Sequence, residues 1–182
     1  SGYFNQSILK RAQEKKLIEK IVESNVGIVI VANKWDLAKN KTSTTQNEYL
    51  SYLAKMLPFI PWAPVVFTSA LSGAKVEKVL EAASHVHDER YRLIDEEEVW
   101  AFMKSIMKQH QPSRGKGVKH PVILRLRQIK VAPPTFSLTV KGQRADSLHP
   151  SYLRFIENRL REKYGFDGSP IVILAKAERR FA

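Results

Sequence analysis

The sequence predicts an α/β fold built from two consecutive parts. Two apolar runs, 26–32 and 64–68, flank a helical pattern, and this order is typical of a βαβ unit with two parallel strands. After residue 94 the pattern changes to helix, two alternating strands, helix and strand, which indicates an α+β domain. We therefore expect one domain over residues 1–94 and a second over residues 95–182.

In the first part, apolar residues recur at helical spacing before and after the first strand pattern. Leu17 and Ile21 mark one helical face, and Leu50 and Leu53 mark another, which ends at Pro58. The expected elements are a helix over 15–24, a strand over 26–31, a polar loop over 38–46, a helix over 47–57, a strand over 64–68 and a helix from 76 to 92.

In the second part, acidic residues open a helix and a proline closes it. Residues 95–98 place four carboxylates at the positive end of the helix dipole, and Pro112 stops the helix. The alternation of leucine with Arg125 and Arg127 changes phase at Gln128, which suggests a β-bulge. The remaining expected elements are a basic loop over 113–120, strands over 122–127 and 135–141, a helix over 151–164 and a strand over 170–175.

The composition limits the classes of function that fit this chain. Its 182 residues carry a formal net charge of +12, with 13 basic and 9 acidic residues up to Ile94 and 17 and 9 beyond it. This excess favours a polyanionic partner such as nucleic acid, and a basic domain that binds nothing is the alternative. Without cysteine there are no disulfides and no thiol chemistry, and no apolar run reaches the roughly 20 residues of a membrane span.

Two polar boxes follow the two expected parallel strands. The first is Asn33-Lys34-Trp35-Asp36, and the second is Ser69-Ala70-Leu71. A right-handed crossover places the carboxyl ends of parallel strands at one edge, so both boxes are expected to face one crevice. Asparagine offers an amide donor and acceptor, aspartate can accept two hydrogen bonds, and a lysine stem can cover a ring. A guanine base fits these groups, and a strand followed by a polar turn is the alternative.

The sequence lacks the segments that perform phosphate chemistry in GTPases. Neither a Gly-x-x-x-x-Gly-Lys-Ser/Thr loop nor an Asp-x-x-Gly segment occurs. Because these segments hold the phosphates, Mg²⁺ and the attacking water, we assign no catalytic residue and expect no GTP hydrolysis by this stretch alone. We expect no metal site, because His85 and His87 lie two residues apart on a helix and cannot share a face.

The two boxes resemble the base-recognition boxes of translation-factor-class GTPases. The resemblance implies that Asn33 and Asp36 read guanine and that Lys34 packs over the base. It also implies that the backbone N–H of Ala70 meets the O6 atom. The nucleotide-binding residues implied are Asn33, Lys34, Asp36, Ser69, Ala70 and Leu71.

A second resemblance covers about residues 15–177. It is carried by the Asn-Lys-Trp-Asp box, residues 59–70, 133–136, 151–161 and 164–171. These segments closely resemble the Der (EngA) family of ribosome-assembly GTPases. The resemblance implies that residues 1–94 are the C-terminal portion of a G domain, with a partial P-loop GTPase-type parallel sheet. It implies that residues 95–182 form a KH-like domain.

The Der resemblance also implies ligands, partners and a location. GTP or GDP would bind the full-length parent, whereas we expect this stretch alone to bind neither. The KH-like domain would bind ribosomal RNA of the large subunit, next to the missing N-terminal G domains, in the bacterial cytoplasm or the plastid stroma. The basic residues expected to contact RNA are Arg114, Lys116, Lys119, Arg125, Arg127, Arg154 and Arg161.

An interaction module is the alternative to an RNA-binding domain. RNA-binding KH domains clamp the backbone with a Gly-x-x-Gly loop. Here Gly165-Phe166-Asp167-Gly168 matches that pattern only between a helix and a strand, where we interpret it as a helix-ending turn. A module of this kind would pack on the G domains and relay the nucleotide state without touching RNA.

Overall fold

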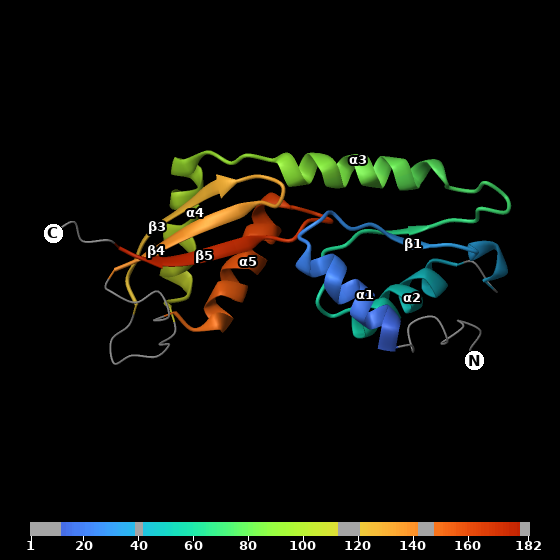
Figure 1. The fold of residues 1–182 in the computed structure, drawn as a ribbon, viewed down its shortest axis with the longest axis horizontal. Coiled ribbons are helices and arrows are strands. Elements are labelled where there is room, and N and C mark those ends of the chain that lie inside the picture. Colours follow the sequence, from blue (N-terminus) through green and yellow to red (C-terminus); the bar gives the residue numbers. More distant parts are fainter. Residues whose placement is uncertain (1–11, 39–41, 113–120, 142–147, 179–182) are drawn as a thin grey trace. The chain divides into compact units, whose positions relative to one another are not determined.

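A computed structural model describes residues 12–38, 42–112, 121–141 and 148–178 (Figure 1). The tertiary contacts divide the chain into two compact units. One comprises Ser1–Asp88 with Asp167–Pro170, and the other comprises Glu89–Phe166 with Ile171–Ala182. The division falls inside a helix, earlier in the chain than the boundary expected after Ile94. Over the described ranges, no helix is both long and apolar enough to cross a membrane.

The first unit contains a two-stranded parallel sheet. β1 (Ile30–Ala32) pairs with β2 (Val65–Phe67), and α2 (Ser43–Met56) connects them. α1 (Ala12–Glu23) precedes β1, and α3 (Glu77–Tyr91) follows β2. The parallel pairing agrees with the βαβ order that the sequence predicts. A small apolar core holds this unit together, with Leu53, Leu57, Ile60 and Ala63 buried at its centre.

The elements of the first unit differ by a few residues in extent from the prediction, and the physical reason is visible for α2 and β1. α2 begins earlier than expected because Thr42 caps it, and the Thr42 Oγ1 atom accepts a hydrogen bond from the N–H of Thr45 at 3.3 Å. β1 is shorter than its apolar run, since only residues 30–32 pair with β2. Upstream of the pair, the Ile28 N–H donates instead to the carbonyl oxygen of Gly168 at 2.8 Å.

Gly168 is held in the first unit by close backbone contacts. Its N–H donates to the carbonyl oxygen of Trp62 at 2.8 Å, and its φ of +67° lies in the left-handed region. A Cβ atom at this position would lie 2.2 Å from a methyl group of Val86 and 2.9 Å from the carbonyl oxygen of Ile28. Only glycine fits without a shift of the surrounding backbone.

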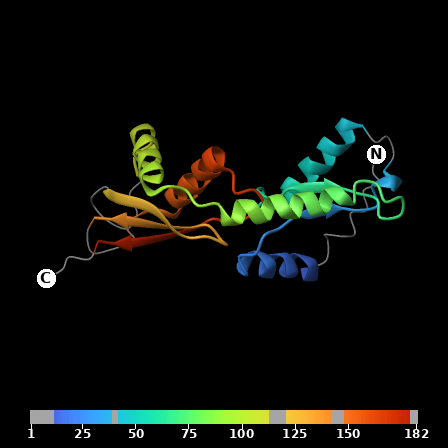
Figure 2. The ribbon, with the colours of Figure 1, turned by 90° about the horizontal axis from the view of Figure 1, so that it is seen from above.

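The second unit contains a three-stranded mixed sheet with the strand order β3-β4-β5. The sequence order is α4 (Glu96–Gln109), β3 (Ile123–Lys130), β4 (Thr135–Val140), α5 (Pro150–Tyr164) and β5 (Val172–Ala177). β4 runs antiparallel to β3 and parallel to β5. Figure 2 shows α4 and α5 on the same side of this sheet. The observed order, α-β-β-α-β, is the one predicted.

One face of this sheet and the two helices enclose the larger core. The helices contribute Val99, Met103, Ile156 and Leu160, and the strands contribute Leu126, Phe136, Leu138 and Val140, all with 0% exposure. Acidic residues open α4 as expected, and Asp95 also caps it, because its carboxylate accepts from the N–H groups of Glu97 and Glu98. The register of β3 on β4 shifts between Gln128 and Lys130, which confirms the predicted bulge.

Candidate functional site

The Asn-Lys-Trp-Asp box directly follows β1 and makes a tight turn. Lys34 adopts a left-handed conformation with φ 60°, and Trp35–Leu37 form the short 3-10 helix η1. The N–H of Trp35 donates to the carbonyl oxygen of Thr68 at 2.9 Å. The N–H of Thr68 donates to the carbonyl oxygen of Ala32 at 3.0 Å. These two backbone bonds join the ends of β1 and β2, so the two polar boxes lie side by side as the sequence predicts.

Asn33 connects the two boxes through its side-chain oxygen. The Asn33 Oδ1 atom accepts from the N–H of Lys34 at 2.8 Å, from the N–H of Ala70 at 3.0 Å and from the Thr68 hydroxyl at 3.4 Å. In the part of the chain that the structure describes, no group accepts a hydrogen bond from its amide nitrogen. Asn33 is exposed, so this nitrogen can donate to an acceptor on a ligand.

Asp36 is positioned by the second box. The Ser69 hydroxyl donates to Asp36 Oδ1 at 2.5 Å, and the N–H of Ser72 donates to the same hydroxyl oxygen at 3.3 Å. Ser69 is buried, with 3% exposure, whereas Asp36 is only half-buried. A buried hydroxyl therefore fixes the orientation of a carboxylate that still reaches the surface.

A small cavity and an aromatic cluster adjoin these residues. The cavity has a volume of about 240 Å³ and is lined by Asp36, Ser69 and Lys75 among others. Trp35 packs on Phe67 with ring centroids 4.4 Å apart. Trp35 belongs to the turn that carries Asp36, so we expect this ring packing to limit the movement of the turn.

The fold therefore brings together the residues predicted to bind the nucleotide. Two of them, Ala70 and Leu71, differ from the roles that the resemblance implies. The Ala70 N–H, which the resemblance assigns to the O6 atom of guanine, donates here to Asn33. The Leu71 side chain is 90% exposed. In the described residues, no group of three histidine, aspartate or glutamate side chains is placed to hold a metal ion.

The residues predicted to contact RNA lie in different parts of the second unit, and three of them fall outside the described residues. Arg114, Lys116 and Lys119 lie outside the described residues. Arg125 and Arg127 are exposed on β3, where Arg125 forms an ion pair with Glu96, and Arg154 is exposed on α5.

Helical spacing predicts that Arg161 shares the exposed side of α5 with Arg154, and this prediction is wrong. Its side chain is only 15% exposed, because it donates to the carbonyl oxygen of Phe166 at 3.0 Å and pairs with Glu157 at 3.2 Å. This arginine supports the turn after α5.

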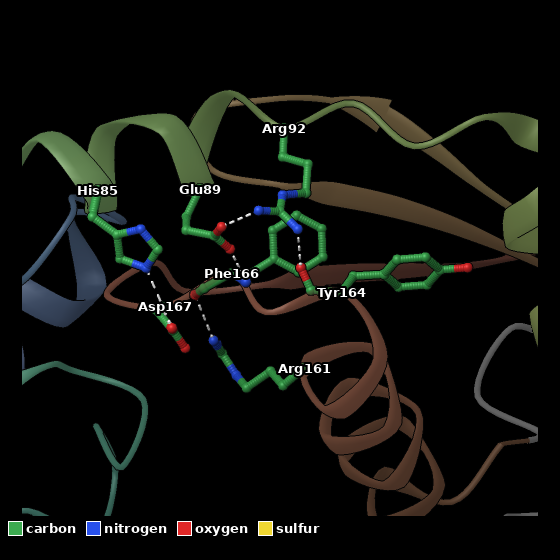
Figure 3. A network of polar contacts seen from close by, with 7 residues as sticks. All are labelled: His85, Glu89, Arg92, Arg161, Tyr164, Phe166 and Asp167. Carbon is green, nitrogen blue, oxygen red and sulfur yellow. Dashed lines mark hydrogen bonds and ion pairs between the residues drawn. The ribbon is translucent and has the colours of Figure 1, made fainter.

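The second unit contains a buried carboxylate that the sequence patterns did not predict. Glu89, in the last turn of α3, has 3% exposure, and it accepts hydrogen bonds from the Phe166 N–H and from Arg92 (Figure 3). Arg92 also donates to the carbonyl oxygen of Tyr164 at 2.7 Å. The network ties the end of α3 to the turn after α5. A signal existed in the sequence, since Glu89 lies three residues after Val86 on the apolar face of its helix.

Comparison with known proteins connects both units to one family. Residues 94–176 match the family described as the KH-domain-like C-terminal domain of EngA bacterial GTPase enzymes. The chain is 34% identical over 169 residues to GTPase Der of Chloroflexus aggregans, covering 93% of the chain and 37% of that protein.

Two further relatives have the same name. The chain is 37% identical to GTPase Der of Alkaliphilus oremlandii, with 87% of the chain and 35% of that protein covered. It is also 37% identical to GTPase Der of Fusobacterium nucleatum, with 88% and 36% covered. The chain spans about a third of the length of these curated relatives. The comparisons identify it as a Der (EngA) family sequence that corresponds to the C-terminal region of its relatives.

Proposed function

We propose that this chain is the part of a Der-type GTP-binding protein that reads the guanine base and binds ribosomal RNA during assembly of the large ribosomal subunit. The observation that carries the proposal is the hydrogen-bonded pairing of the two boxes. Ser69 orients Asp36, and Ala70 with Thr68 orients Asn33. The bonded residues of the two loops are 33 and 37 residues apart in sequence. The loops thus present one amide and one carboxylate at the same edge of the sheet.

The chemistry of these groups fits guanine better than adenine. A carboxylate accepts from the N1–H and N2–H₂ groups of guanine, whereas the corresponding edge of adenine has no N1–H donor. The free amide nitrogen of Asn33 suits the acceptors of the O6/N7 edge. The stem of Lys34 is exposed beside the box and can cover a ring. For the N–H of Ala70 to meet O6, it must be shared with or released from Asn33.

A titration with nucleotides tests the base-reading proposal. Because this sequence contains no P-loop, we expect weak contact that depends on the base and no stable complex. NMR spectra of the labelled chain should show shifts of the Asn33 side-chain amide and the Ala70 N–H with millimolar GDP. The same concentration of ADP should leave both signals unchanged. Equal shifts with both nucleotides would show that the loops do not read the base.

The RNA part of the proposal rests on the charge of the second unit and its KH-like family match. The chain beyond Ile94 has 17 basic and 9 acidic residues, and Arg127 and Arg154 are exposed there. Contacts of such residues with phosphates release counterions, so binding should weaken steeply with salt. Affinity for large-subunit RNA that barely changes between 50 and about 200 mM salt would contradict binding of this kind.

A second candidate function, relay of the nucleotide state, is favoured by the path of α3. This helix starts after the loop that carries Ser69–Lys75 and ends in the Glu89 network of the second unit. A ligand that changed the loop could act on the end of the helix through a rigid element. Hydrogen exchange of the Phe166 amide with and without GDP tests this function, and an unchanged rate would contradict it.

A further inference from the structure

The sheet of the second unit has a second face, opposite the one that packs on α4 and α5. Side chains alternate between the two faces, and residues in register on neighbouring strands share a face. The core residues Leu126 and Leu138 are paired in register. The residues directly before and after each of these leucines in sequence therefore belong to the other face.

This second face carries a strip in which basic side chains lie beside hydroxyl side chains, and we call it the basic–hydroxyl strip. Three basic residues on β3 lie in register with three hydroxyl residues on β4. The pairs are Arg125 with Thr139, Arg127 with Ser137 and Lys130 with Thr135. The bulge after Gln128 returns Lys130 to the face of the two arginines, although a strict alternation would have placed it with the core. The local irregularity of β3 thus extends the run of basic side chains.

The basic side of the strip is available to a ligand, whereas Thr135 and Ser137 on the hydroxyl side are buried and the Thr135 hydroxyl donates to the carbonyl oxygen of Pro133. Arg127 and Lys130 are exposed and have no ion pair with any residue that the structure describes. Arg125 pairs with Glu96, whose side chain is itself 43% exposed. The next strand, β5, adds the exposed Lys176 in register with Thr139. Glu178, just beyond the end of β5, is the nearest acidic residue along that strand.

Ser137 provides an independent observation. Its side-chain hydroxyl is buried, with 2% exposure of the residue, and has no hydrogen-bond partner among the described residues. It lies in register between Arg127 and Leu174. A buried polar group without a partner is uncommon in folded proteins and costs stability unless something satisfies it. An acceptor oxygen bound beside Arg127, which is in register with Ser137, is the kind of group that could satisfy this hydroxyl.

We propose that the basic–hydroxyl strip binds the phosphate backbone of RNA. The inference rests on the proposed RNA binding and assigns it to the sheet face, in place of the α5 face that carries Arg154. Arginine and lysine, together with hydroxyl side chains, commonly contact phosphate oxygens, and such contacts carry no base information. The strip contains no aromatic ring on which bases could stack. It therefore fits binding that depends on charge and is indifferent to sequence.

The test compares two triple variants of the full chain that remove the same charge from opposite faces. One is R125A/R127A/K130A. The matched control is K104A/K108A/K163A, from exposed positions on the two helices. The probe is a labelled RNA of mixed single-stranded and duplex structure, titrated at several salt concentrations. A plot of log affinity against log salt counts the phosphate contacts, at about 0.7 to 0.9 per contact.

We expect the strip variant to lower the salt slope by about 2 and the control variant to leave it within about 0.5. Both variants should retain the thermal unfolding midpoint of the parent chain, because all six side chains are exposed. If both variants lose slope equally, or only the control does, the sheet face is not the site while RNA binding itself stands. If the parent chain binds no RNA and binds an acidic peptide instead, the proposed RNA function fails together with this inference.

Discussion

Removal of the Glu89 carboxylate should destabilise the second unit more than any surface charge does. The side chain is 3% exposed and accepts hydrogen bonds from the Phe166 N–H and from Arg92. In Glu89→Ala the buried N–H loses its acceptor, which costs about 1 to 3 kcal/mol. Arg92 is 45% exposed, so water replaces most of its lost interaction and adds little. We expect a total loss of about 2 to 3 kcal/mol.

Chemical denaturation and hydrogen exchange measure this loss in complementary ways. The Phe166 amide should exchange faster in Glu89→Ala, while Glu89→Gln should retain part of the protection because its amide oxygen still accepts. The control is Glu81→Ala, which removes an exposed ion pair with Lys78 and should cost less than about 0.5 kcal/mol. Equal stabilities of the Glu89→Ala and Glu81→Ala variants would refute the assignment of Glu89 as a buried anchor.

Three other changes give distinct expectations. Gly168→Ala should destabilise the first unit by more than about 2 kcal/mol, whereas Gly73→Ala, also at positive φ but in open space, should cost only about 1, as urea unfolding can show. Burial raises the pKa of Tyr152 to about 12. Because the unfolded phenol ionises near 10, stability should fall as pH rises from about 10 to 12, and Tyr152→Phe should remove that part of the slope in unfolding measurements. Glu96→Gln should raise RNA affinity a few-fold at low salt by releasing Arg125, and a decrease would contradict the role of the strip.

The sequence predicted the order of elements and the pairing of the two boxes because both depend on local patterns. Apolar runs and helical spacing mark the elements, and the crossover rule alone brings Asn33 and Ser69 to one edge. The extent of β1 was not predictable in this way. An apolar run over 26–31 reads as one strand, but the number of paired residues depends on Gly168, which lies far along the chain.

The electrostatic surface was the least predictable property. Helical spacing placed Arg161 with Arg154, yet a carbonyl oxygen two residues beyond the helix draws the Arg161 guanidinium inward. Likewise, Lys130 joins the arginine face only because the bulge resets the register of β3. Such cases depend on hydrogen bonds between residues distant from the pattern being interpreted, so periodicity alone cannot find them.

The most direct test of the base-reading account is the variant Asp36→Asn. Its amide oxygen can still accept from N1–H, while its amide nitrogen can donate to the carbonyl that xanthine has in place of the guanine amino group. The account predicts that the shifts of Asn33 and Ala70 will then respond to xanthosine diphosphate and no longer to GDP. Ser72→Ala, which leaves the hydroxyl of Ser69 on Asp36, should keep the preference for GDP. A variant Asp36→Asn that still responds to GDP as the parent chain does would contradict the account.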